Sequence, residues 1–491
     1  MRERAYRIDG PAAALALALL ASLAGCADTE VQGVIFEQDM DEPELMIGLA
    51  RGVNSEFADI FLAADAQYTL DSPTDAITND GTAASEVQLA VSDFRERPAS
   101  SLWGQAHEAV WAALYADRRL KEVLPPEDYE VSPLFARMFI YGAHAERILG
   151  ECFCNLIYNY GPEGGILLGK EGPYDGSRIV PSDSAFKRGI AMAQRALAVA
   201  EAAVAAGVEA PEDDPIFDPQ RLVYAAHASL AQLYANLGDW AQAVQHARLV
   251  PDGFADYSHM HPEVDGGNVI ADLFYQGDDL SLYRTPAALL WATDPRVALR
   301  KCGDWRSANL DDSPSVPPSS AFINMSAQCG NVAGEYRSES NRYPLWISGK
   351  YEDDNADVEI ASGAEMRLIE AEAALLAGQL GEFTAQVNRA RQARGVAEIT
   401  APTEIGGLEY PNAEDDAWSI LDRERYLELL LEGRRFWDLR RWNHPFWTEN
   451  HVLLPRHADR LPPGGRMKCF EIPDLECDTN ASINCPVLTS G

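Results

Sequence analysis

The sequence predicts a mainly α-helical protein in which helical hairpins are separated by long irregular loop insertions. Apolar residues recur at three- and four-residue steps, the spacing that lines one face of a helix, whereas the alternation typical of strands is scarce. Stretches rich in Pro, Gly and Asp interrupt this pattern, and residues of these types end helices. The periodic segments are 45–70, 101–123, 133–160, 184–207, 219–249, 362–394 and 416–442.

Residues 1–25 predict a lipoprotein signal peptide. Three arginines precede an uncharged apolar run at 12–23, which is the layout of an export signal and is too short to span a bilayer. The string Leu-Ala-Gly-Cys that ends at Cys26 resembles the bacterial lipobox, in which the cysteine is acylated and becomes the mature N-terminus. We therefore expect Cys26 to carry fatty acids such as palmitate that tether the protein to a membrane. The alternative is an ordinary cleaved signal.

Charge and composition limit the classes of partner. The net charge of −36 repels nucleic acid and anionic membrane surfaces, so we expect neither as a partner. Residues 26–44 are acidic and predict a solvated leader, which leaves 45–491 for the folded body. No stretch after the signal peptide is expected to be long and apolar enough to cross a membrane.

Two segments predict helical hairpins of the same kind. In 225–251, Gly238 suits the left-handed turn that ends a helix, and Asp239 suits the cap of the next helix. Residues 364–394 repeat this arrangement around Gly378. Both resemble the tetratricopeptide repeat, whose helix pairs stack so that each buries its neighbour's apolar face. A weaker third copy is 137–160 followed by 184–207, which predicts a superhelix with long insertions between its hairpins.

The most specific pattern lies at 419–442. A helix rich in Arg and Glu is followed by Glu-Gly, an aromatic pair and Asp-Leu-Arg-Arg-Trp. This pattern resembles the signature helix of the SusD/RagB family of nutrient-uptake outer-membrane lipoproteins. The aromatic helix around Trp103, the turn at 158–162 and the element at 469–473 resemble further parts of that family in the same order. The cysteine-flanked insertion at 302–334 departs from the family pattern.

The residue types of this motif point to a structural role. Leucines at helical spacing form an apolar stripe, and Arg and Asp side chains can pair along or between helices. A glycine inside a helix suggests a close packing contact. The alternative is that Arg434 or Arg435 clamps a carboxylate or phosphate. The residues assigned to the structural motif are Glu432, Gly433, Arg434, Trp437, Asp438, Arg441 and Trp442.

The family resemblance implies a SusD-like substrate-binding domain over 45–491 and a function without catalysis or cofactor. It implies an outer-membrane lipoprotein, lipid-anchored and facing the cell exterior, that captures oligomeric nutrients. Oligosaccharides are the commonest ligands of the family, and peptides are a further option. The partner it implies is a SusC-like TonB-dependent outer-membrane transporter. The alternatives are a lipid-anchored surface hydrolase, which would turn over its substrate, and a helical-repeat scaffold, which would bind only proteins.

Sugar binding requires flat aromatic faces beside hydrogen-bonding groups. Four aromatic residues in loop-like segments are therefore the candidate ligand contacts: Trp305, Trp346, Tyr343 and Tyr283. The sequence contains no phosphate-binding glycine loop, no nucleophile-elbow motif and no zinc-protease motif.

Seven of the eight cysteines follow Cys26. Cys302 and Cys329 bracket an irregular loop and are the preferred disulfide pair, because export permits disulfides. The three cysteines in the tail allow one further bridge. Cys152 and Cys154 are two residues apart on a predicted helix and are interpreted as small core residues, and no metal site is expected.

Overall fold

The computed structural model describes residues 42–62, 66–79, 84–94, 99–158, 179–260, 267–272, 280–301, 323–324, 346–351, 353, 355–412 and 415–479. The chain divides into two units, Met1–Leu45 and Met46–Gly491. In the first unit the described part contains the short 3-10 helix η2 (Pro43–Leu45). The signal peptide, Cys26 and most of the acidic leader lie outside the described residues.

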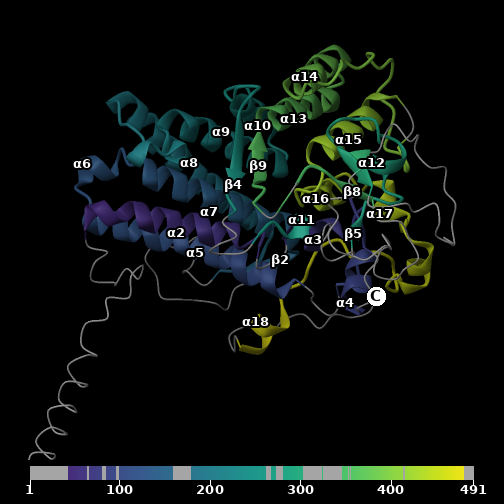
Figure 1. The fold of residues 1–491 in the computed structure, drawn as a ribbon, viewed down its shortest axis with the longest axis horizontal. Coiled ribbons are helices and arrows are strands. Elements are labelled where there is room, and N and C mark those ends of the chain that lie inside the picture. Colours follow the sequence, from purple (N-terminus) through teal and green to yellow (C-terminus); the bar gives the residue numbers. More distant parts are fainter. Residues whose placement is uncertain are drawn as a thin grey trace, which may run out of the picture. The chain divides into compact units, whose positions relative to one another are not determined.

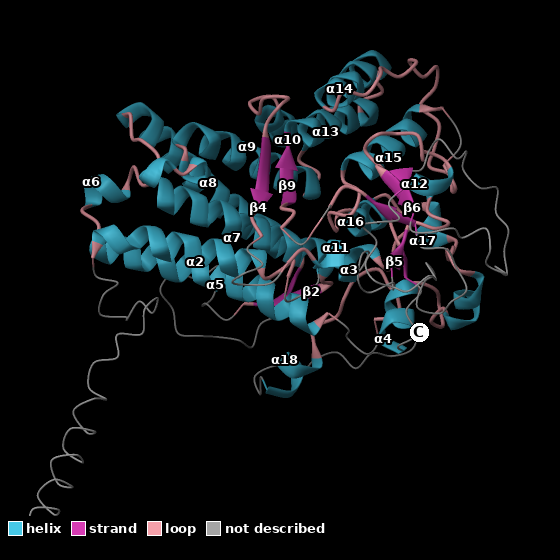
Figure 2. Cartoon of the chain, viewed as in Figure 1, coloured by secondary structure: helices cyan, strands magenta, loops and turns pink. Residues whose placement is uncertain are grey.

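The second unit is built mainly from helices, which confirms the predicted fold class (Figures 1 and 2). The helices of its first part are α2 (Met46–Ala58), α3 (Ala66–Asp71), α4 (Ala84–Ala90), α5 (Ser100–Val123), α6 (Pro126–Tyr129), α7 (Pro133–Cys152), α8 (Asp183–Ala206), α9 (Pro219–Asn236) and α10 (Trp240–Ala247). Later helices are α11 (Val269–Asp272), α12 (Pro286–Leu289), α13 (Gly363–Leu376), α14 (Leu380–Ala393), α15 (Ala417–Glu428), α16 (Arg435–Arg441), α17 (Pro445–Thr448) and α18 (Asp474–Thr479). Short 3-10 helices are η4 (Pro211–Asp213), η5 (Pro215–Phe217) and η9 (Pro455–Arg460).

Short strands tie together segments that are distant in sequence. The strands are β1 (Thr78–Asn79), β2 (Asn155–Ile157), β3 (Ile179–Pro181), β4 (Ala255–Ser258), β5 (Leu280–Ser281), β6 (Leu299–Lys301), β7 (Ile323–Asn324), β8 (Trp346–Ser348) and β9 (Val358–Ser362). The pairs β1–β5, β2–β3, β4–β9 and β6–β8 are antiparallel, and β6–β7 is parallel. The β4–β9 pair holds the start of α13 beside the end of the first predicted hairpin, because β9 runs directly into α13.

Helix α7 forms the centre of the helical layer. Every one of its residues is buried, and α2, α5, α8, α9 and α16 all pack against it. Figure 1 shows α2, α5, α7, α8 and α9 lying side by side. Helix α8 has the length and mean hydropathy of a membrane-spanning helix, contrary to the prediction from the sequence. One side of α8 packs between α7 and α9.

The two predicted hairpins are present as α9–α10 and α13–α14. Gly238 and Gly378 both adopt left-handed backbone angles, with φ of 75° and 70°, at the turns between the helices. The Asp239 carboxylate accepts a hydrogen bond of 3.2 Å from the Gln242 backbone N–H and so caps α10. Helix α10 packs against α13, so the second hairpin stacks on the first across the intervening insertion. The weaker third copy corresponds to α7 packed against α8.

The signature segment is two helices and not the single helix that the sequence predicts. Helix α15 ends at Glu428 and α16 begins at Arg435. Leu431 and Gly433 in the intervening turn have φ of 61° and 70°. Gly433 is therefore at a helix break, which corrects its assignment to a helix interior. The close contact expected there is present, because a Cβ at Gly433 would lie 3.2 Å from Leu70 Cδ1.

A disulfide links Cys154 to Cys469, with 5.2 Å between the Cα atoms. Cys154 lies beyond the end of α7, which corrects its assignment as an unpaired core residue on a helix. The neighbouring backbones also pair, since Cys154 N–H donates to the Phe470 carbonyl at 2.9 Å. Cys152 is free and buried, as predicted, and Cys477 is disulfide-bonded. The preferred pair Cys302 and Cys329 lies outside the described residues and stays a prediction.

Candidate functional site

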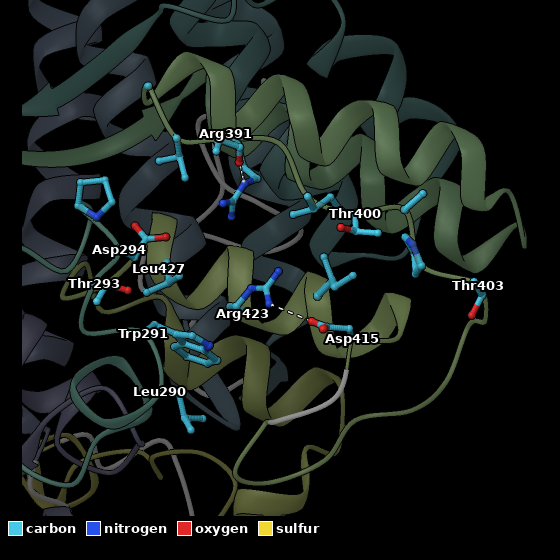
Figure 3. Close-up of a pocket in the computed structure, with 18 residues that line it drawn as sticks. Leu290, Trp291, Thr293, Asp294, Arg391, Thr400, Thr403, Asp415, Arg423 and Leu427 are labelled. Atoms are coloured by element: carbon cyan, nitrogen blue, oxygen red, sulfur yellow. Dashed lines mark hydrogen bonds and ion pairs between the residues drawn. The ribbon is translucent and has the colours of Figure 1, made fainter. Parts of the chain in front are cut away.

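A cavity of about 750 Å³ lies beside α15 (Figure 3). Three segments form its walls: the chain that follows α12, the end of α14 with the loop that leads to α15, and one face of α15 itself. Ile420, Arg423 and Leu427 on α15 recur at three- and four-residue steps, so helical geometry places them all on the cavity side. We name this cavity the Trp291 pocket.

Trp291 supplies the aromatic surface of the pocket. Its half-buried ring packs edge-to-face against the buried Tyr426, with ring centroids 5.3 Å apart. The preceding helix α12 positions it, and Thr285 caps that helix by accepting a hydrogen bond from the Ala288 N–H. Leu290 is 42% exposed and extends the apolar surface at the rim.

Glu424 organises the charged wall of the pocket. Its carboxylate is fully buried and contacts three guanidinium groups. The contacts are to Arg296 at 2.8 Å, Arg391 at 2.6 Å and Arg423 at 3.2 Å. Buried ions are stable only when they are paired and hydrogen-bonded, so these arginines are held in fixed positions. Arg423 also reaches towards Asp415 at 3.5 Å, the dashed line in Figure 3.

Asp294 provides a second fixed charge at the pocket. Arg296 donates to both of its carboxylate oxygens, at 3.0 and 2.9 Å. Burial opposes ionisation of this carboxyl, but the hydrogen bonds and charge of Arg296 outweigh it and lower the pKa of Asp294. The side chain is therefore an ionised hydrogen-bond acceptor at neutral pH.

The pocket combines features suited to a polyhydroxylated ligand. The Trp291 ring offers an apolar face, the arginines donate hydrogen bonds, and the carboxylates accept them. Three threonines add hydroxyls that can donate or accept hydrogen bonds: Thr293, Thr400 and Thr403. Among the described residues, no group of three or more His, Cys, Asp or Glu side chains is arranged to hold a metal ion.

The structure differs from the sequence interpretation of Trp346 and Tyr283. Both side chains are fully buried in one hydrophobic cluster, where their rings meet edge-to-face at 5.2 Å. Trp346 belongs to β8, whose three residues are all buried, and its backbone N–H donates to Ser281 Oγ at 2.9 Å. Their ring faces are therefore not open to a ligand as the loop assignment assumed. The other two candidates, Trp305 and Tyr343, lie outside the described residues.

Trp291 was not among the candidates from the sequence. It follows a short apolar run and belongs to no motif, as is typical of a core residue. The Thr-Asp-Pro that follows it signals a turn and is the only local sign that the ring lies near the surface.

The residues of the signature motif pair with one another and with the helical hairpins. Arg434 contacts Glu365 at 2.8 Å, and Arg441 pairs with Glu372 and Asp438. Further ion pairs join Arg425 to Asp438 at 2.8 Å, Arg435 to Asp75 at 2.7 Å and to Asp422 at 2.5 Å, and Lys350 to Glu432 at 2.5 Å. Two indole N–H groups donate hydrogen bonds of 2.8 Å: that of Trp437 to Asn236 and that of Trp442 to Glu372. The side chains of Arg434 and Arg435 are 6% and 4% exposed, so neither guanidinium is placed to clamp a ligand from solvent.

The buried acids in this region have pKa values shifted in both directions. Burial raises the pKa of Asp71 to about 7, because few opposite charges compensate it. Burial also opposes ionisation of Asp438, but Arg425 and Arg441 outweigh it and lower the pKa of Asp438 to about 2.

Comparison with known proteins agrees with the fold and with the signature segment. Residues 348–476 match the sequence model of the SusD family. A SusD-like protein P38 from Formosa agariphila is 37% identical over 90 residues, and this match spans 18% of each chain.

Solved structures match over nearly the whole chain. A chitin-binding SusD homologue from Flavobacterium johnsoniae superposes with a TM-score of 0.61 at 13% identity, covering 88% of this chain and 94% of that one. A SusD superfamily protein from Bacteroides vulgatus gives 0.56 at 14% identity, covering 90% and 98%. A laminarin-binding SusD-like protein gives 0.54 at 14% identity, covering 91% and 100%.

These matches show a SusD-like helical fold built on tetratricopeptide-like hairpins. The sequence match to the SusD family at residues 348–476 agrees with this fold.

Proposed function

We propose that this protein is a cell-surface binding protein that captures an oligosaccharide in the Trp291 pocket and does not cleave it. The observation that carries the proposal is the combination, in one cavity, of an aromatic ring with fixed charged groups and hydroxyls. The C–H face of a sugar ring stacks on an indole, and its hydroxyls pair with carboxylates and guanidinium groups. The volume of about 750 Å³ lies within the range of ordinary ligand pockets.

Two structural neighbours support a glycan as the class of ligand. One is described as chitin-binding and the other as laminarin-binding. Both share the fold over most of their length, although their sequence identity to this chain is low.

The proposal includes an anchored location and a hand-off. Residues 1–25 would be removed as a signal peptide, Cys26 would be acylated, and 26–44 would link the lipid to a SusD-like domain at 45–491. The captured ligand would then pass to a TonB-dependent outer-membrane transporter. Metabolic labelling with palmitate tests the anchor: label should enter the wild-type protein and be absent from Cys26→Ser.

The binding test compares two tryptophans. Trp291→Ala should weaken binding to soluble laminarin or chitin oligosaccharides at least tenfold, measured by calorimetry, because it removes the stacking surface. Trp111→Ala is the matched control, since Trp111 is 53% exposed on α5 and lies outside the pocket. Trp291→Phe retains an aromatic face and should recover part of the affinity.

Three outcomes would contradict the proposal. The first is equal loss of affinity in Trp291→Ala and Trp111→Ala. The second is a wild-type protein that binds no glycan across a broad polysaccharide panel. The third is cleavage of the oligosaccharide by the purified protein, which would favour a hydrolase.

A further inference from the structure

A second cavity, of about 620 Å³, lies where the two stacked hairpins meet the signature segment. The end of α9, the start of α10 and the end of α13 form one side of it. The start of α15, the end of α16 and residues 406–408 of the α14–α15 loop form the other side. We name this cavity the tryptophan pocket.

Three tryptophans from separate segments line the tryptophan pocket. Trp240 is the first residue of α10, Trp418 is the second residue of α15, and Trp442 directly follows α16. All three are half-buried, so each is anchored in the fold and still presents part of its ring. Trp418 and Trp442 pack edge-to-face with centroids 6.0 Å apart. Aromatic surface gathered in this way marks a ligand site more often than isolated exposed rings do.

The floor of the tryptophan pocket carries fixed polar groups. The side chain of Glu372 is 2% exposed, and it accepts hydrogen bonds from the Arg441 guanidinium at 2.7 Å and from the Trp442 indole at 2.8 Å. Asn236 donates to Glu151 at 2.8 Å and accepts from the Trp437 indole, also at 2.8 Å. These groups are held in place before any ligand arrives, which lowers the entropy lost on binding.

The rim formed by the α14–α15 loop is also held in place. Two backbone N–H groups at the start of α15 donate to this loop: Ala417 to the Glu404 carbonyl and Trp418 to the Ile405 carbonyl, both at 3.1 Å. Ser419 Oγ donates to the Gly407 carbonyl at 3.3 Å. The loop therefore keeps its position relative to Trp418.

Helix α15 separates the tryptophan pocket from the Trp291 pocket. Arg423 and Leu427 face the Trp291 pocket, and the helical period turns Trp418 to roughly the opposite side. The same α14–α15 loop lines the Trp291 pocket with residues 395–403 and the tryptophan pocket with 406–408. The two cavities are thus about one helix diameter apart, roughly 10 Å.

We propose that the tryptophan pocket is a second glycan-binding site, which holds another stretch of the same polymer chain. Like the Trp291 pocket, it places aromatic faces beside a carboxylate and a guanidinium, and it adds the amide of Asn236. Two sites on one rigid unit raise the affinity for a long chain far above that for a short one, because the second contact is intramolecular. This inference rests on the proposed glycan-binding function.

The experiment compares a long polysaccharide with an oligosaccharide too short to reach both cavities. Trp240→Ala and Trp418→Ala should each reduce affinity for the polysaccharide at least tenfold and leave affinity for a short oligosaccharide at the Trp291 pocket within about threefold. Trp111→Ala again serves as the control and should change neither. Circular dichroism and thermal melting identify any variant that fails to fold.

A measurement on the wild-type sequence covers the case of an unstable variant. In protein labelled with 5-fluorotryptophan, the polysaccharide should shift the fluorine resonances of Trp240 and Trp418. Trp240→Phe and Trp418→Phe assign those resonances and keep an aromatic ring in place.

The outcomes separate this inference from the proposed function. In one outcome, Trp291→Ala abolishes short-chain binding, the Trp240 and Trp418 variants keep full polysaccharide affinity, and the fluorine resonances do not move. That outcome refutes the second site and leaves the proposed function standing. If Trp291→Ala is silent and the other variants lose binding, the assignment of the Trp291 pocket fails and the second site stands. A protein that binds neither glycan refutes both.

Discussion

Glu424 shows how one side chain can hold a binding surface in position. A single buried carboxylate contacts Arg296, Arg391 and Arg423, which come from three different segments. The wall of the Trp291 pocket therefore depends on a group that a ligand in the pocket need never touch.

Replacing Glu424 should affect stability and binding together. Glu424→Gln removes the charge that compensates three guanidinium groups, and loss of one partner in a buried ionic cluster costs about 3 kcal/mol. We expect a lower unfolding midpoint in urea and weaker oligosaccharide binding. Asp415→Asn is the control for stability only, because Asp415 itself lines the pocket. Its side chain is 89% exposed and its contact with Arg423 is long, so less than about 0.5 kcal/mol of stability should be lost. Equal effects of the two substitutions on stability would reject the assigned role of Glu424.

Asp71 should make the stability of the protein depend on pH. It is fully buried, and its carboxylate accepts the Gly433 N–H at 3.2 Å. Burial raises its pKa from 3.8 to about 7, so the folded chain binds the proton more tightly than the unfolded chain does. The resulting stability is fully present below the unfolded pKa and is lost as pH rises through the folded pKa.

The Asp71→Asn variant isolates this contribution. Urea unfolding of the wild type should give a free energy that falls by up to about 1.4 kcal/mol per pH unit between about pH 4 and 7 from this one group. The variant should lose that part of the slope, because an amide does not titrate. An unchanged slope between the two proteins would show that Asp71 ionises normally in the fold.

The helical hairpins depend on glycine at their turns. Gly238 and Gly378 both have positive φ, and an added Cβ would meet no atom within 4 Å at either position. Alanine there should therefore be opposed by backbone conformation alone, at about 1 kcal/mol.

Thermal unfolding of Gly238→Ala and Gly378→Ala measures this backbone effect. Each midpoint should fall by a few degrees, while Gly381→Ala should be neutral or slightly stabilising. Gly381 lies inside α14 with equally open surroundings and a φ compatible with other residues, so alanine favours the helix there. A fall of similar size in Gly381→Ala would contradict the explanation.

Local sequence signals predicted the hairpins well because all of their determinants are close in sequence. Apolar periodicity, a turn glycine and a capping aspartate lie within one segment and act whatever surrounds them. The break at Gly433 was not predicted, because the apolar pattern continues through Leu429, Leu430 and Leu431 as though the helix did. The contacts that accompany the break, with Leu70 and Asp71, come from a distant part of the chain.

Candidate binding residues were harder to predict for a related reason. The Trp291 pocket is assembled from three segments, and no single segment carries a recognisable pattern. Trp346 looked exposed because its neighbours in the sequence are typical of loops. Its burial arises from β6, which pairs with β8, and from Tyr283. The sequence predicted that the charges of the signature motif pair, but it did not identify their partners. Arg434 pairs with Glu365 and Arg441 with Glu372, and both of these partners lie on α13.

A disulfide bond links the chain just after α7 to the C-terminal segment. The Cys154–Cys469 disulfide joins residues 315 positions apart. In the chain-entropy description, closing a loop of that length stabilises the fold by about 6 kcal/mol. Cys154→Ser combined with Cys469→Ser should therefore lower the thermal midpoint strongly.

Ligand binding provides the control for the disulfide variant. Neither cysteine lines either pocket, so oligosaccharide affinity measured well below the new midpoint should remain within about twofold. A double variant with an unchanged midpoint would show that the bond adds little to the folded state.

The same bond determines what happens when a protease cuts the protein. Any single cleavage between residues 154 and 469, a span that includes the insertion at 302–334, leaves two fragments joined by the disulfide. Nicked molecules should run as one band on a non-reducing gel and separate only after reduction. Cleavage within a loop would then leave the two parts of the protein covalently linked.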